Sequence, residues 1–147
     1  MLRRLVIVTA LFITAAPAAA APQAAPVTGT SVPAAEQVAR AAMSGDMAQM
    51  QRLTGAHVSL RGKTARALRK TKAYRDVLLV TGPDFKLGEI PSGFEFVLRI
   101  PNQLVSGPLP DLVETTGTVA GWQDRAHEEG TPGRVAFRPI ISVDFLK

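Results

Sequence analysis

The 147-residue sequence contains no cysteine. A chain without cysteine has no disulfide framework and no thiolate metal site. It also has no cysteine that could carry an N-terminal lipid, so we expect the mature protein to be soluble. Its stability must therefore come from a packed core, which a domain of well over 100 residues can form without covalent staples.

Residues and motifs that are typical of catalysis are also scarce. The only histidines are His57 and His127, and the patterns H-E-x-x-H, G-x-x-x-x-G-K-[ST] and G-x-S-x-G are missing from the sequence. His127, Glu128 and Glu129 are consecutive, and because adjacent side chains rarely point at one ion, we interpret them as part of a solvated loop. We expect neither enzyme activity nor a cofactor.

The first 20 residues have the layout of a secretory signal peptide. Arg3 and Arg4 precede an apolar stretch of residues 5–16, and small residues follow Pro17. The apolar stretch is shorter than the roughly 20 residues that a membrane-spanning helix needs. We predict cleavage between Ala20 and Ala21, which would release a periplasmic or secreted protein. The alternative is an uncleaved N-terminal anchor.

The residues that follow the cleavage site predict a linker and then a helical segment. Residues 21–33 are rich in Pro, Ala and Thr without charge or periodicity, which is typical of a flexible linker. Residues 34–54 have helical composition, and Ser44-Gly45-Asp46 is a candidate break within the helix. Four residues of this segment recur at helical spacing and predict one packing face: Ala39, Met43, Met47 and Met50.

From residue 55 onward the periodicity is that of strands. Val58 and Leu60 fall on one face of a first strand, Arg61 falls on the other, and Gly62 indicates a bulge or sharp bend. Residues 63–74 also contain many good helix formers. A strand and a helix both remain possible there, and we favour the strand.

Four further strands are expected, at residues 77–81, 94–100, 113–123 and 135–145. In residues 94–100 the even-numbered positions are apolar and are predicted to face inward. In residues 135–145 the odd-numbered positions are apolar in the same way. Pro108 and Pro110 leave room for at most a short turn of helix between the third and fourth of the five strands. The predicted class is mainly β, a small five-stranded barrel preceded by an N-terminal helix.

This pattern resembles an OB-fold over residues 55–147. The resemblance is carried by His57–Leu60 followed by Gly62, similar to a long bent first strand, and by Glu114–Trp122 (ETTGTVAGW), similar to the fourth strand of exported and tRNA-anticodon-like bacterial OB-fold proteins. The chain departs from the family between the third and fourth strands, where prolines replace a helix. The resemblance implies a ligand face on the second and third strands, flanked by loops 69–76 and 124–133.

The strongest binding feature is a run of cations that has no acidic residue before Asp76. Such a run attracts polyanions, and Tyr74 could stack on a base or a sugar. The alternative is a solvated face that protects an exposed strand from aggregation. The candidate binding residues are Arg61, Lys63, Arg66, Arg69, Lys70, Lys72, Tyr74, Arg75, Trp122 and Glu128.

The second loop is acidic, with Asp124, Glu128 and Glu129 against one Arg125. Proteins that follow a phosphate backbone seldom place acid along one side of the groove. Our first hypothesis is therefore a protein or cell-envelope partner, bound in a cleft between loops 69–76 and 124–133 whose two charge signs orient the partner. The alternative is an anionic polymer, such as single-stranded nucleic acid, lipopolysaccharide or a glycan, bound by residues 61–75.

Overall fold

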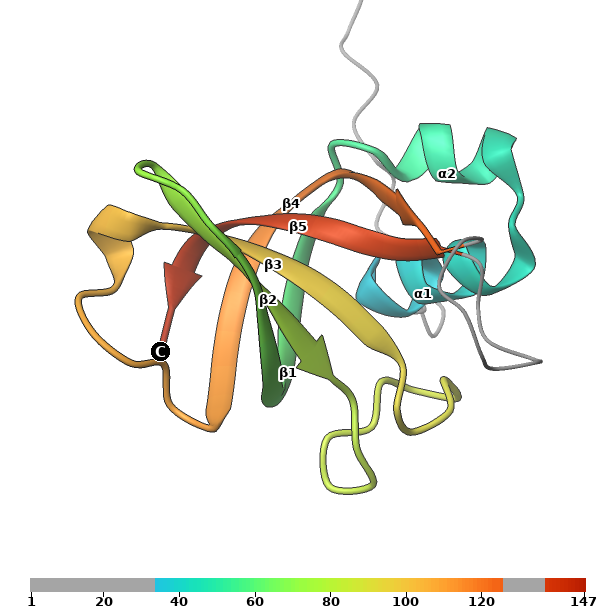
Figure 1. Ribbon diagram of the computed structural model, residues 1–147. Coiled ribbons are helices and arrows are strands. Elements are labelled where there is room, and N and C mark those ends of the chain that lie inside the picture. Colours follow the sequence, from blue (N-terminus) through green and yellow to red (C-terminus); the bar gives the residue numbers. More distant parts are fainter. Residues whose placement is uncertain (1–33, 126–136) are drawn as a thin grey trace, which may run out of the picture. The chain divides into compact units, whose positions relative to one another are not determined.

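The computed structural model describes residues 34–125 and 137–147, which form two short helices and a closed five-stranded sheet (Figure 1). The predicted signal peptide, the linker, and most of loop 124–133 lie outside the described residues. None of the described helices is long and apolar enough to cross a membrane.

The helical segment consists of α1 (Ala34–Ser44) and α2 (Met47–Leu53). The predicted break is confirmed: Gly45 has a φ of 67°, which favours glycine, and the Asp46 side chain accepts hydrogen bonds from the first turn of α2. The small side chains of α1 pack against the core near β1 and β5, so this helix lies close to the sheet.

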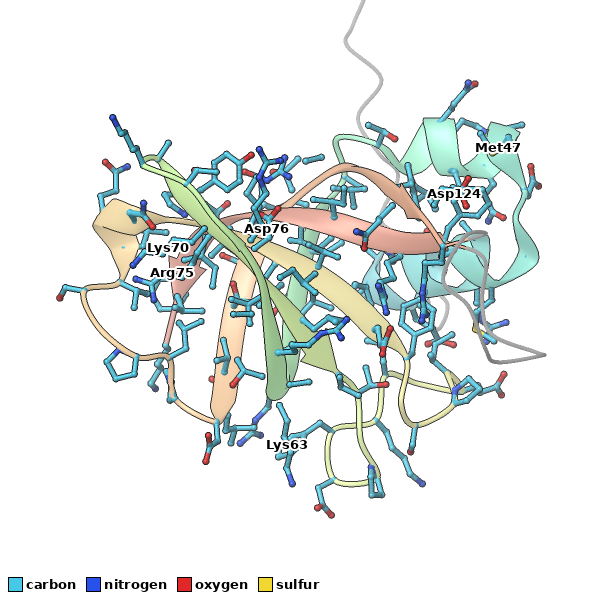
Figure 2. The ribbon with its side chains drawn as sticks, in the orientation of Figure 1. Met47, Lys63, Lys70, Arg75, Asp76 and Asp124 are labelled. Atoms are coloured by element: carbon cyan, nitrogen blue, oxygen red, sulfur yellow. The ribbon has the colours of Figure 1, made fainter. Side chains whose placement is uncertain are left out.

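The prediction of one methionine face is wrong. Ala39 and Met50 are buried as expected, but Met43 and Met47 are 41% and 57% exposed. The physical reason is the break at Gly45, because α2 starts again with its own rotation about its axis and the spacing across the break loses its meaning. Figure 2 shows Met47 on α2, of which it is the first residue.

All five predicted strands are present, and the sheet closes in the order β1-β2-β3-β5-β4. All neighbouring strands are antiparallel except β3 and β5, which are parallel. A single turn of 3-10 helix follows β3, as the prolines indicated. The elements are β1 (His57–Lys70), β2 (Tyr74–Val80), β3 (Glu95–Pro101), η1 (Asn102–Leu104), β4 (Leu112–Asp124) and β5 (Phe137–Leu146).

β1 is a strand along its whole length, and it has two different partners. Residues 57–63 pair with β4, and residues 63–70 pair with β2. Gly62 lies where the partner changes, and a Cβ atom there would lie 2.7 Å from the carbonyl oxygen of Val80. Glycine is therefore required by the close approach of the backbones. The register shifts of β1 lie further along, between Thr64 and Arg66 and between Ala67 and Arg69.

The core fills the inside of the closed sheet. The even-numbered side chains of residues 94–100 are buried in it, as predicted. The alternation of β5 ends early, because Phe145 is 54% exposed. A register shift causes this difference: Val143 is opposite Gly117 and Phe145 is opposite Thr116, so Asp144 is an extra residue that reverses the side on which Phe145 lies.

Candidate ligand-binding surface

Five cations of β1 and its hairpin form what we call the basic strip: Lys63, Arg66, Arg69, Lys70 and Lys72. Lys63, Arg66 and Arg69 are opposite Val80, Leu78 and Asp76, so the two register shifts keep all three on the outer face of the sheet. All five side chains are exposed, and none of them has an ion pair or a side-chain hydrogen bond with another described residue. Figure 2 shows Lys63 and Lys70 well apart along the paired stretch.

Arg61, by contrast, is held in place. Its Nε atom lies 3.1 Å from Glu114 Oε1, and its guanidinium lies 5.1 Å from the centre of the Phe85 ring. The ion pair is half-exposed, so it contributes little to stability. The ion pair with Glu114 does neutralise the positive charge of Arg61, which is one of the candidate binding cations.

Arg75 and Tyr74 have structural contacts as well. Arg75 donates hydrogen bonds to the carbonyl oxygens of Gly107 and Val105, at 2.8 and 2.9 Å, and so holds the connection between β3 and β4. The Tyr74 ring lies 4.5 Å from the guanidinium of Arg99. One face of that ring is therefore already covered by a cation.

Arg99 links this aromatic ring to a buried carboxylate. Its Nε and Nη2 atoms donate to the two oxygens of Asp76, each at 3.0 Å, and this hydrogen-bonded carboxylate raises the pKa of Arg99. Asp76 is therefore occupied by Arg99, although Arg69 is opposite it in the register. Because Arg99 takes this acceptor, Arg69 stays available to a ligand.

The hairpin that carries Lys70 and Lys72 is rigidly connected to the rest of the sheet. Thr71 Oγ1 accepts hydrogen bonds from the backbone N–H groups of Ala73 and Tyr74. Asn102 donates to the carbonyl oxygens of Thr71 and Ala73 from its side chain and its backbone. These contacts fix the backbone of the turn, so its cations are presented from a preorganised position.

The outer face of β2, β3 and β5 carries an apolar row between two charged clusters. Leu78, Val97 and Ile140 are neighbours across the three strands, and Leu78 and Val97 are each only 3% exposed although they face away from the core. The Asp76–Arg99 pair lies on one side of this row, two residues along the strands. On the other side Glu95 binds Arg125 and Arg138, at 3.1 and 2.5 Å.

Trp122 lies away from the basic strip. It is opposite Pro139, packs partly against the core, and donates from Nε1 to Thr54 Oγ1 at 3.1 Å. Trp122 lies two residues before loop 124–133, and its binding role stays a prediction. Glu128 lies outside the described residues.

The bases of the two predicted binding loops lie at opposite ends of β3. The hairpin end is fixed by the pairing of Tyr74 with Pro101, and the other end by the ion pairs of Glu95 with Arg125 and Arg138. Six residue steps separate Glu95 from Pro101, or about 20 Å at roughly 3.3 Å per residue. Lys70 and Asp124 are correspondingly far apart in Figure 2. A ligand that contacts the bases of both loops must therefore extend along the whole length of β3.

The basic strip is visible in the sequence, whereas the Glu95–Arg125–Arg138 cluster is not. Arg138 is almost completely buried between apolar neighbours in the sequence, and no local pattern names Glu95 as its partner. Among residues 34–125 and 137–147, no three His, Asp or Glu side chains are grouped as metal ligands.

Comparison of the chain with protein-family models, with curated proteins and with solved structures gives no match.

Proposed function

We propose that the chain is an exported OB-like binding module that binds an anionic polymer of the cell envelope along the basic strip. The OB-like assignment is supported by the strand order, by the parallel β3–β5 pair, and by the change of partner along β1. The chain differs from the usual pattern because only η1 lies between β3 and β4, and α1 packs on the core instead.

The observation that carries the proposal is the basic strip itself. Five exposed cations without partners among the described residues lie on one strand and its fixed hairpin, while the neighbouring Arg61, Arg75 and Arg99 are all engaged. A polyanion gains free energy there mainly by releasing condensed counterions. The acidic loop, which argued against a polymer, has its base at the far end of β3 from the hairpin.

The polymer need not be a nucleic acid. Sequence-independent binding of single strands combines cations with aromatic rings on which bases stack. Near the basic strip, two aromatic residues are among the described positions, Tyr74 and Phe85, and an arginine covers one face of each ring. A sulfated, phosphorylated or uronic glycan requires cations without such a stacking platform, so a glycan or lipopolysaccharide fits this surface better.

Salt dependence tests the proposal. Heparin and single-stranded DNA serve as model polyanions, and binding is measured over a range of salt concentrations. The triple variant Lys63→Gln, Arg66→Gln, Arg69→Gln should bind more weakly and should reduce the slope of log K against log salt by roughly two to three. The control triple Arg52→Gln, Lys86→Gln, Lys147→Gln changes the net charge equally at exposed positions outside the strip and should leave most of the slope intact.

If the unaltered chain shows no salt-sensitive binding to either polyanion, the polymer proposal is wrong. The first hypothesis, a protein partner that spans the face from loop 69–76 to loop 124–133, would then be the one to pursue. If both triples weaken binding equally, the attraction comes from net charge and has no defined site.

A further inference from the structure

A short part of β1 has a free edge. Thr64 N donates to the carbonyl oxygen of Asp111 and Val119 N donates to that of Ala56, which sets the phase of the β1–β4 ladder. Backbone hydrogen bonding alternates along an antiparallel strand, so Val58, Leu60 and Gly62 point their N–H and C=O groups at β4. The intervening residues point theirs to the opposite edge.

Ser59 and Arg61 are therefore the residues whose backbone groups lie on this second edge. β2 covers the same edge only from the Lys63–Val80 pair onward, and after Val80 the chain turns away at Thr81. No described residue forms a backbone hydrogen bond with Ser59 or Arg61 on this edge. Two N–H donors and two C=O acceptors thus remain available at the normal repeat of a strand, about 6.6 Å.

A cavity of about 500 Å³ lies along this edge. Ser59, Leu60 and Arg61 all line it, which means that it follows the edge of the strand, since successive side chains point to opposite faces. The opposite wall is the β2–β3 connection, including Phe85 and Leu87. We call this cavity the edge groove.

We propose that the edge groove binds an extended peptide segment of a partner protein by strand addition. Alternating N–H and C=O groups at strand spacing are complementary to another peptide backbone, and exposed edges of this kind are templates for pairing. A glycan or a nucleic acid has no such repeat of amide donors and acceptors. The groove adjoins the basic strip at Lys63, and this inference does not depend on the polymer-binding function.

The walls of the groove define the kind of peptide that fits. Phe85 and Leu87 offer apolar surface, whereas Asp84 and Lys86 are charged groups at its exposed part with no ion pair among the described residues. Because side chains of an added strand alternate between two sides, a segment of alternating apolar and polar residues can contact both the apolar wall and the charged groups. Arg61 stays over Phe85 and paired with Glu114, which keeps the apolar wall in place.

The test uses a phage-displayed library of random linear peptides, selected against the whole chain as its expression host processes it. The selected peptides are then synthesised and titrated. We expect binding to shift the amide signals of Ser59 and Arg61 and to slow their hydrogen exchange. Ser59→Pro removes one outward N–H and fills its place, and should weaken binding at least about tenfold, whereas Ser59→Ala keeps the N–H and should bind normally.

Proline on a free edge leaves the bonds of Val58 and Leu60 to β4 intact, and thermal unfolding checks that the variant folds. If it does not fold, N-methylation of alternate peptide nitrogens gives an independent test. Methylation of the set that faces β1 should abolish binding, and methylation of the other set should not. Failure to select any peptide, equal binding by folded Ser59→Pro, or equal effects of both methylation patterns would overturn the proposal. So would occupation of the edge by a second copy of the chain, seen as a dimer that Ser59→Pro dissociates.

Discussion

Cations of the same type have different roles along β1 and β2. Arg75 donates to two backbone carbonyl oxygens and is partly buried, whereas Arg66 is exposed and has no partner among the described residues. A charged hydrogen bond to a partly buried acceptor stabilises a fold, and an exposed unpaired cation does not. Whether a hydrogen-bond acceptor lies within reach of the cation therefore decides whether it stabilises the fold or stays available for binding.

Truncation of these two arginines should therefore have different consequences. Arg75→Ala removes the bonds to Val105 and Gly107 and should lower the free energy of unfolding by about 1–3 kcal/mol. Arg66→Ala is the matched control and should change it by less than about 0.5 kcal/mol. Chemical denaturation of both variants gives the comparison. Equal stability of the two variants would show that the β3–β4 connection does not depend on Arg75.

Gly62 is a second position where a single residue decides the local structure. Gly62→Ala places a methyl group against the backbone of Val80 and the side chain of Leu79, and should destabilise the fold by about 1–3 kcal/mol. Gly121→Ala is the control, because a Cβ there has no atom within 4 Å, and it should be nearly neutral. Thermal unfolding measures both. A neutral Gly62→Ala would mean that β1 and β2 can separate at this point.

At the scale of elements, Glu36 connects α1 to the β2–β3 connection. It accepts hydrogen bonds from Arg40 within the helix and from the backbone N–H of Glu89, while Arg40 also bonds the Glu89 side chain. The hydrogen bond from Arg40 lowers the pKa of Glu36 below the usual glutamate value of 4.5. One carboxylate therefore positions the wall of the edge groove relative to the helix.

This contact should make stability depend on pH in acid. Because the folded-state pKa of Glu36 is lowered, its contribution is fully present above the ordinary pKa and is lost as the pH falls through the lowered value. The Tm difference between the unaltered chain and Glu36→Gln should thus be largest near neutrality and should disappear in acid. Arg40→Met should move the pKa of Glu36 back up, as carboxyl titration by NMR would show. A Tm difference that is constant with pH would contradict this account.

At the scale of the whole molecule, the local patterns and the long-range pairings differ in how far the sequence predicts them. Strand periodicity, the Ser44–Asp46 break and the short turn after β3 depend on neighbouring residues and were predicted. The parallel β3–β5 pair and the free edge at Ser59 and Arg61 depend on where distant strands meet, and no local pattern encodes that. The same holds for the site: the cations were visible, but their acceptors at Glu114 and Gly107 lie far along the chain.

The compartment of the molecule is the last property that can be tested, and the proposed binding of an envelope polymer depends on it. We predict that the exported chain begins at Ala21, since small residues at Ala18 and Ala20 are what signal peptidases require. Ala20→Lys should block processing, and Ala24→Lys, in the predicted linker, should not. Mass spectrometry of the periplasmic and membrane fractions distinguishes the products.

Removal of the leader leaves 15 basic and 12 acidic residues, so the small remaining excess is less than the five cations of the basic strip alone. Recovery of full-length, membrane-bound chain from the unaltered sequence would refute cleavage and would place the strip next to anionic lipid headgroups, which would then compete with a soluble polymer for it.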